Sequence, residues 1–324
     1  MRSEVMGKLA ALLLPKEEWC AEQRARVRAE AIDRAKADAL AMYAAAKEAA
    51  AADLARTRRE IAWFQPVQVV QAMAIYEAEV DVLQKACAAL GSLVLDAGHR
   101  ARVVRAGGID AVVSAMAAHP ADEHLQGHAC RVLAHLSDDD ARACTTIARA
   151  GGLEAVTSAM RTFDHALQLQ QSGCAVLAHS LAVQEVDEPE EVAVRLALEL
   201  AEAIVEAEGV GLLLVALTNT PEDAAVQRDC CAALAALAQH GEGQHKVIVS
   251  RGAMHAALFA VRRHRALAEV VAEACLLLST LAAGQPAVKR AFVEAQGISE
   301  ICSVLSEHES EPSVQTQALT VLWV

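Results

Sequence analysis

Three residues that could bind a metal lie close together in the sequence. His124 and His128 are four residues apart, which puts two imidazoles on one face of a helix, and Cys130 follows nearby. The residue after His124 is Leu125, however, whereas a zinc protease needs a glutamate there as its general base. Because no second pair of ligands accompanies these residues, we expect neither a metal site nor another cofactor.

Other arrangements that perform chemistry are missing from the sequence. It contains no phosphate-binding loop, no dinucleotide fingerprint and no Ser, His and Asp in the pattern of a hydrolase. Its glycines recur too regularly to form a nucleotide-binding loop. We therefore expect a protein without catalytic activity.

The regular glycines mark an internal repeat. Residues 106–116 read AGGIDAVVSAM, and residues 150–160, 44 positions later, read AGGLEAVTSAM. Weaker copies begin at Gly209, Gly252 and Gly297, so that the marker glycines from Gly108 onward are 44, 57, 43 and 45 residues apart. We expect each marker glycine to open a helix at a position that needs φ > 0 or close packing.

A second motif runs in phase with the glycines. A Val or Leu, usually followed by Gln, precedes a Cys, and a Leu stands three residues after that Cys. The Cys, or Leu319 in the last copy, lies 22 residues after its marker glycine in four of the five repeats and 23 residues after Gly252. The cysteines of this set are Cys87, Cys130, Cys174, Cys231 and Cys275. Two motifs in register indicate tandem structural units.

Apolar residues three and four apart, without alternating runs, predict that the units are helical. Their length and pattern resemble the armadillo-repeat family, whose unit has a short first helix, a glycine turn, a second helix and a long third helix. The resemblance covers about residues 67–324. It implies an all-α, right-handed armadillo solenoid of five glycine-marked units and a leading partial one, in which each repeat contacts only its neighbours.

The resemblance also implies a binding surface, because the third helices of armadillo proteins line a concave groove for extended peptides. The groove of importin-alpha-type proteins has a Trp one residue after the repeated Cys and an Asn four residues after that Trp. Here the first row reads Ala88, Arg131, Ala175, Ala232 and Leu276, and the second reads Ser92, His135, His179, Ala236 and Thr280. The absence of Trp and Asn disfavours recognition of nuclear-import cargo.

Several polar residues remain in the expected groove and are able to bind a partner's main chain or carboxylates. They are Gln84, Arg131, His135, Gln171, His179 and Arg228. The alternative is that they form a solvated polar edge. If His135 and His179 contact a partner, its affinity should change with pH near ~6.5.

The charge of the chain restricts its partners. The formal net charge is -13. Residues 1–66 hold 12 Lys and Arg and 10 Asp and Glu, whereas the repeats hold 17 and 32 and are therefore net -15. This balance disfavours nucleic acid and anionic membranes. No apolar run approaches the ~18 residues of a membrane span, so we expect protein or peptide partners and no membrane insertion.

The repeated cysteines predict the redox compartment. Equivalent positions in stacked helices are roughly 8–10 Å apart, beyond the ~7 Å limit for a disulfide. We therefore interpret these cysteines as small buried apolar residues in a reducing compartment. The expected location is the cytoplasm, with the nucleus or the cilium as alternatives.

Three stretches depart from the repeat pattern. Residues 1–66 form an N-terminal helical extension with an Ala-rich helix over about 17–64, which packs on the first repeat or stands in solvent and is also able to dock a partner. The interval of 57 residues predicts an insertion at about 183–193. This insertion lies on the binding face or is a neutral extension of the surface. An unusually long first helix is expected after it, over 192–205. The last repeat is uncapped at Leu322 and Trp323, so either the array continues beyond this sequence or this end docks on a partner.

The pattern as a whole favours a protein-interaction scaffold or adaptor that holds a peptide or helix of a partner in its groove. A nuclear-transport-type receptor is one alternative. The other is a regulator of a GTPase, such as an exchange factor, because some armadillo proteins act in that way.

Overall fold

The computed structural model describes residues 45–61, 64–138, 140–182, 190–239 and 242–324 and the single residues 23, 26 and 42. The chain divides into two compact units, Met1–Arg59 and Glu60–Val324. In the first unit residues 45–59 are helical. The rest of the helix predicted over 17–64, and most of the insertion predicted at 183–193, lie outside the described residues.

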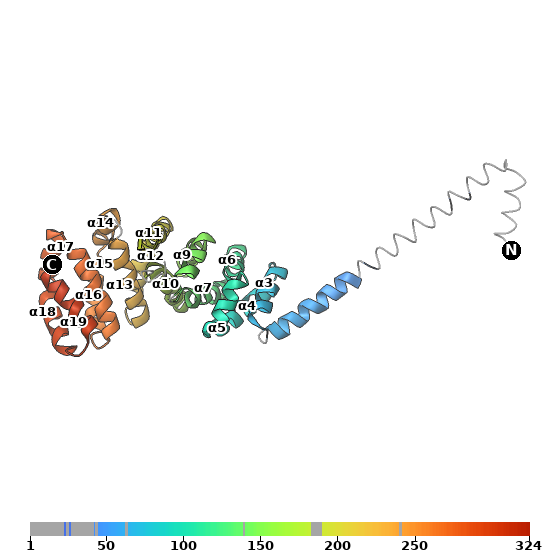
Figure 1. Cartoon of the computed structure of the whole chain (residues 1–324), viewed down its shortest axis with the longest axis horizontal. Helices are drawn as coiled ribbons and strands as arrows, with labels where there is room; N and C mark the ends of the chain where they lie inside the picture. The colour runs from blue at the N-terminus through green and yellow to red at the C-terminus, as the bar shows by residue number, and fades with distance from the viewer. Residues whose placement is uncertain are drawn as a thin grey trace, which may run out of the picture. The chain divides into compact units, whose positions relative to one another are not determined.

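The second unit repeats one order of helices (Figure 1). A pair comes first, α3 (Pro66–Ile75) and α4 (Val80–Leu93), and five triplets follow. The first helices of the triplets are α5 (Ala97–Arg105), α8 (Ala141–Arg149), α11 (Glu190–Glu206), α14 (Glu242–Ser250) and α17 (Pro286–Glu294). The second helices are α6 (Gly108–Ala118), α9 (Gly152–Thr162), α12 (Gly209–Asn219), α15 (Ala253–Arg263) and α18 (Gly297–Glu307). The third helices are α7 (Glu123–Ser137), α10 (Leu167–Leu181), α13 (Ala224–Gln239), α16 (Ala268–Ala282) and α19 (Pro312–Trp323).

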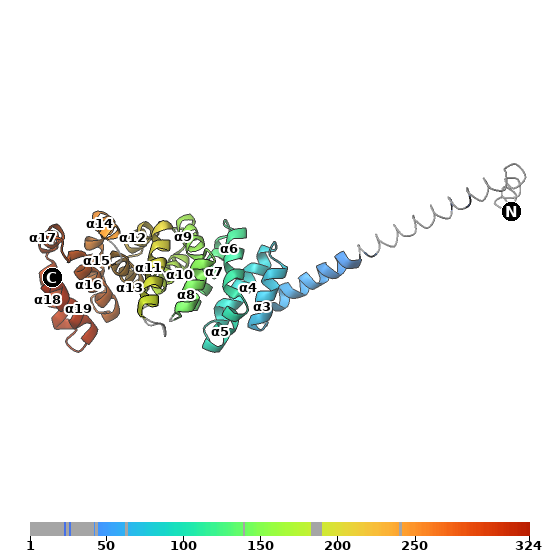
Figure 2. The ribbon, with the colours of Figure 1, turned by 45° about the horizontal axis from the view of Figure 1, so that its top comes forward.

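The triplets stack in chain order from α3 to α19 (Figure 2). The third helices pack on one another in succession, α4 on α7, then α10, α13, α16 and α19. The residues that the structure describes include no strand. The second unit is thus an all-α, right-handed armadillo solenoid, as the sequence predicted. The long first helix predicted over 192–205 is also confirmed, since α11 has 17 residues where the other first helices have 9.

The repeated cysteines lie in the continuous core between the third helices. Cys87, Cys130, Cys174, Cys231 and Cys275 are fully buried and free. Burial raises the pKa of the Cys87, Cys130 and Cys275 thiols to about 12. These residues therefore stay protonated and serve as small apolar side chains.

One cysteine contact was not expected from the repeat positions. Cys230 precedes the repeated position by one residue, and its Sγ lies 3.4 Å from Sγ of Cys174 in the previous third helix. The spacing argument applies only to equivalent positions and so does not cover this pair.

The glycines before the second helix have two separate roles. Gly107, Gly151 and Gly252 have φ of 78°, 78° and 84°, the left-handed region that favours glycine. The residue after each of them opens the second helix and packs closely on the first. A Cβ at Gly152 would lie 2.8 Å from the carbonyl oxygen of Ile147.

This distinction explains the irregular spacing around Gly252. Gly252 has the left-handed role, and Ala253 occupies the position of Gly152. Counted from Ala253, the repeats before and after it are both 44 residues long, and Cys275 lies 22 residues further on. The marker glycines were therefore out of phase by one residue in this repeat.

The repeated Gln closes the turn between the second and third helices. Gln170 is buried, and its Nε2 donates to the carbonyl oxygens of Met160 at 2.8 Å and Phe163 at 3.1 Å. Gln126, Gln227 and Gln315 make the same pair of bonds in their own repeats. The side chain thus gives a donor to a carbonyl that the end of the second helix leaves unpaired, such as that of Met160. It also adds a second donor to a carbonyl of the turn, such as that of Phe163, which already accepts from the Ala166 N–H.

Histidines in this same turn join neighbouring repeats. His264 Nε2 lies 2.8 Å from the carbonyl oxygen of Pro221, and His308 Nε2 lies 2.7 Å from that of Arg265. His119 makes the equivalent bond to Glu77 at 3.1 Å. Each of these three histidines donates to the main chain of the preceding repeat and therefore has a structural role.

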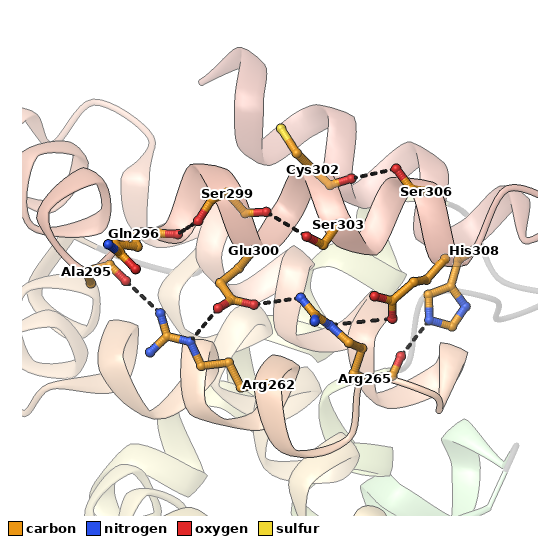
Figure 3. A network of polar contacts seen from close by, with 11 residues as sticks. Arg262, Arg265, Ala295, Gln296, Ser299, Glu300, Cys302, Ser303, Ser306 and His308 are labelled. Atoms are coloured by element: carbon orange, nitrogen blue, oxygen red, sulfur yellow. Dashed lines mark hydrogen bonds and ion pairs between the residues drawn. The ribbon is translucent and has the colours of Figure 1, made fainter.

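An ion-pair network reinforces the junction between α15 and α18 (Figure 3). Arg262 Nε lies 3.1 Å from Oε1 of Glu300, and Arg265 Nη2 lies 2.7 Å from Oε2 of the same carboxylate. Arg262 also donates to the carbonyl oxygen of Ala295 at 2.7 Å. Glu300 therefore holds two arginines of the preceding repeat, and this network is structural.

Candidate partner-binding surface

The six polar residues predicted for the groove all stand on third helices and are all half-buried. Gln84 is on α4, Arg131 and His135 are on α7, Gln171 and His179 are on α10, and Arg228 is on α13. Three of them, Gln84, Gln171 and Arg228, occupy the same position, three residues before the repeated Cys.

Residues in this shared position form bonds between repeats. Gln84 Nε2 lies 2.9 Å from both carboxylate oxygens of Asp122, the N-cap of α7, which also accepts from the Leu125 N–H. Burial raises the pKa of Asp122, but these two hydrogen bonds outweigh it, so the pKa is lowered overall. Gln171 bonds in the same way to Asp223, the carboxylate that caps α13.

Arg228 continues the series. Its Nη1 lies 3.3 Å from Oε2 of Glu269 in α16, and its Nε lies 2.8 Å from Oδ1 of the buried Asp229. We call these contacts of Gln84, Gln171 and Arg228 the inter-repeat ladder. The ladder gives the three side chains partners within the chain.

The ladder is interrupted between α7 and α10. Gly127 stands in the position of Gln84 and Gln171 and has no side chain to extend. Ala166 is the N-cap of α10, where Asp122 stands before α7, and it makes no side-chain cap. A hollow of about 230 Å³ lies at this junction. The polar residues that line it are Glu123, His124, His128 and Arg131 of α7 on one side and Gln168, Gln171 and Ser172 of α10 on the other.

A row of nitrogen bases runs along α7 beside the hollow. His124, His128, Arg131 and His135 are 4, 3 and 4 residues apart, a spacing that puts them on one face of the helix. We call these four residues the basic stripe. Its members come from two of the predicted groove residues and from the two histidines first considered as metal ligands.

Two histidines of the stripe, His128 and His135, favour the neutral form. Burial, followed by the charges of Arg131 and His124, lowers the pKa of His128. Burial and Arg131 also lower the pKa of His135. Arg131 Nη2 lies 3.1 Å from Nδ1 of His128, and because arginine only donates, Nδ1 is the acceptor and the proton is on Nε2. The pH window expected near ~6.5 for His135 therefore lies lower.

The remaining predicted residue, His179, joins α10 to the end of α7. Its Nδ1 lies 3.1 Å from Oγ of the buried Ser137, and its Nε2 lies 3.9 Å from Oδ1 of Asp138. This junction is therefore bonded at the C-terminal end of α7, while its N-terminal end carries the hollow.

The sign of the charge changes along the third helices. Two residues before the repeated Cys, the chain places Lys85, His128, Ser172, Asp229 and Glu273 in successive repeats. Glu273 is half-buried, and burial raises its pKa. The end near α4 and α7 is therefore basic and the end near α13 and α16 is acidic.

The structure does not bring His124, His128 and Cys130 together as ligands of one metal ion. Cys130 is fully buried in the core, whereas His124 is exposed. Within the described ranges, no three His, Cys, Asp or Glu side chains come together as a metal site would need.

Sequence reasoning did not find the hollow itself. Its signal is an omission, because Gly127 and Ala166 stand at positions that hold Gln and Asp at the α4–α7 and α10–α13 junctions. The stripe carries a positive signal as well, since the spacing of its four bases follows one face of a helix.

Replacing Gly127 by Ala is expected to raise the free energy of unfolding by about 0.5–1 kcal/mol, because a Cβ there meets no atom within 4 Å and Ala favours helix. Urea denaturation of both proteins measures the change. Gly173→Ala in α10 is the contrasting variant, since its Cβ would lie 2.5 Å from Sδ of Met160. Equal effects of the two substitutions would contradict this account of the hollow.

The helix triplet, the left-handed turn and the stacked third helices define the armadillo-repeat fold. The family model that describes the LRRK2 ARM repeat matches residues 210–324. No curated protein matches the chain. None of the described helices combines the length and the apolar composition that crossing a membrane requires.

Three solved structures with the same fold are designed or engineered proteins. An engineered protein is 24% identical, with a TM-score of 0.61, over 80% of this chain and 96% of its own. The designed armadillo repeat protein YIII(Dq)4CqI is 19% identical, with a TM-score of 0.61, over 80% of this chain and 99% of its own. A further designed armadillo repeat protein, in complex with the peptide (KR)4, is 18% identical, with a TM-score of 0.59, over 80% and 99%.

Proposed function

We propose that this protein is a non-catalytic scaffold or adaptor that holds a peptide segment of a partner protein against its third helices. The observation that carries the proposal is the interrupted ladder, which leaves a hollow lined by polar side chains in the row that binds peptides in armadillo proteins. The complex of a designed armadillo protein with (KR)4 supports peptide binding by this fold. The buried free thiols are compatible with a reducing compartment, and we propose that the protein acts in the cytoplasm.

A functional surface should differ from the rest of the array in how its polar groups are used. Gln84 and Arg228 bond to the next repeat, whereas the α7–α10 junction lacks that contact. A partner chain that enters the hollow is able to supply the missing polar contacts. The groove residues on α7 and α10 therefore contribute most to binding, and Gln84 and Arg228 contribute mainly to the fold.

Affinity capture from the source cell with the full chain tests the surface. A photo-crosslinking residue at Ser172, which lines the hollow, is expected to label a peptide of the captured partner, and the same residue at the exposed Ser158 of α9 is expected to label none. The double variant Arg131→Glu and His179→Glu should lose at least about tenfold of the captured partner, since reversed charges at an interface disfavour binding by several kcal/mol.

The matched control reverses the charge of Arg149 in α8 and replaces His255 in α15 by Glu. Both side chains are exposed on first or second helices and lie outside the hollow. The proposal fails if partners bind the Arg131 and His179 variant as well as they bind this control, or if Ser172 labels no partner.

A further inference from the structure

We propose that the hollow and the basic stripe of α7 bind carboxylates of an acidic peptide segment in the partner. This inference rests on the proposed function and specifies the chemistry of the peptide that the groove takes. Its basis is the contrast between the stripe and the repeats as a whole, which are net -15.

Acidic side chains near the stripe already have partners. Asp122 accepts from Gln84 and from the Leu125 N–H. Glu123 lies 3.4 Å from Nε2 of His165, and Asp138 lies 3.9 Å from Nε2 of His179. Among the residues that the structure describes, no carboxylate forms an ion pair with Arg131, whereas Asp122 lies near His128 and Asp138 near His135.

Donors of the stripe line the hollow. Arg131 is one of the lining residues and contacts His128 through Nη2, whereas its Nε is buried beside Gly91 of α4. In the neutral form fixed by Arg131, the Nε2–H of His128 is a donor. Carboxylates match such donors, because charge-assisted hydrogen bonds to arginine are the stronger kind. The hollow of about 230 Å³ has room for a Glu side chain, since it equals the volume of roughly eight waters.

Arg131 is placed for this role by a neighbouring glycine. A Cβ at Gly91 of α4 would lie 3.1 Å from Nε and 3.2 Å from Nη2 of Arg131. The absence of a side chain at Gly91 thus lets the guanidinium of Arg131 pack beside α4. Because this packing already restricts the Arg131 side chain, the side chain loses less conformational entropy when a ligand binds.

The opposite end of the row excludes acidic peptides. Asp229, Glu269 and Glu273 gather around the single cation Arg228. Like charges placed together oppose binding. An acidic segment therefore lies at the α7 end, and residues of the partner that reach α13 and α16 are neutral or basic.

Proton uptake should accompany the binding of carboxylates. On its own helix, His128 faces His124, Arg131 and Asp122. On α10 the polar residues beside it are the uncharged Gln168, Gln171 and Ser172. Lys85 lies on α4. His135 faces Arg131, Asp138, Arg100 and His179. A bound carboxylate favours protonated histidine. The affinity for acidic peptides should therefore rise as the pH falls. Most of this rise should occur below pH ~6.5, because the pKa values of His128 and His135 are lowered in the free protein.

Fluorescence anisotropy with the full chain and three labelled octapeptides tests the inference. The peptides are Glu-rich, its Gln-for-Glu counterpart, and (KR)4. We expect the Glu-rich peptide to bind at least about tenfold more tightly than the other two at pH 7, and about 3–10-fold more tightly at pH 5.5 than at pH 7.5. Arg131→Met keeps the apolar stem without the charge and should weaken this peptide about tenfold.

Two further variants separate binding from stability. Gly127→Leu fills the hollow without changing any charge and should weaken the Glu-rich peptide about tenfold, although the protein remains folded because no atom lies within 4 Å of the new Cβ. Glu273→Gln at the acidic end is the control and should leave the affinity unchanged or slightly raised.

The outcomes distinguish this inference from the proposed function. If the Gln counterpart or (KR)4 binds as tightly as the Glu-rich peptide, or if Arg131→Met has no effect, the acidic chemistry is wrong, while crosslinking from Ser172 still supports a peptide-binding groove. If no peptide binds and Ser172 labels no partner, both proposals fail. Affinity for the Glu-rich peptide that stays constant from pH 7.5 to pH 5.5 overturns the role of the histidines.

Discussion

Gly152→Ala is expected to lower the free energy of unfolding by about 3 kcal/mol, near the upper end of what overpacking costs. The added methyl would lie 2.6 Å from Cγ2 of Ile147 and 2.8 Å from its carbonyl oxygen. A backbone carbonyl in a helix moves only if α8 moves, and α8 packs on α9 and α10. The strain therefore spreads into the core instead of being absorbed by one side chain.

The adjacent glycine provides the control. Gly151 has φ of 78°, and a Cβ there would meet only Oε2 of Glu154 at 3.9 Å. Gly151→Ala should lower the free energy of unfolding by about 1 kcal/mol, the cost of a left-handed non-glycine residue. Denaturant titration of both variants measures the difference, and a larger effect at Gly151 than at Gly152 would refute the two roles assigned to the pair.

Gln170→Leu should lower the free energy of unfolding by about 1–2 kcal/mol, because it leaves the carbonyl of Met160 without a donor. The carbonyl of Phe163 loses one of its two donors and keeps the Ala166 N–H at 3.1 Å. The amide now bonds to Met160 at 2.8 Å and to Phe163 at 3.1 Å, and the side chain is 5% exposed, so little water is available to replace it. Leu has nearly the same volume, which limits the effect of a cavity.

Gln168→Leu is the matched substitution on the same helix, since Gln168 is exposed. It should change stability by less than about 0.5 kcal/mol. Thermal melts of the two proteins compare them directly. An unchanged melting temperature for Gln170→Leu would show that water or a relaxed turn satisfies the carbonyls.

The sequence was informative about the fold because the repeat made each signal recur. The Gln that precedes Cys174 and its counterparts marked the third helices, and α7, α10 and α13 lie where this motif predicted. The phase error at Gly252 arose because a left-handed turn and a close packing contact both select glycine, and only one of the two was present in that repeat.

The binding surface was harder to predict from residue types alone. Gln84, Gln171 and Arg228 are polar and half-buried like groove residues, yet their bonds to Asp122, Asp223 and Glu269 depend on the register between helices about 40 to 50 residues apart. A sequence pattern shows that two residues recur in register, but not which of them meet across a junction. The hollow at Gly127 was likewise visible only once its neighbours were placed.

The interrupted ladder also has a mechanical consequence. Ser137 and His179 fasten α7 to α10 at one end of their interface, whereas no rung fastens them at the other. In a solenoid, strain passes only between adjacent repeats. We therefore expect a bend of the array to open the α7–α10 interface first at its N-terminal end, beside Gly127, and to leave the bonded end closed.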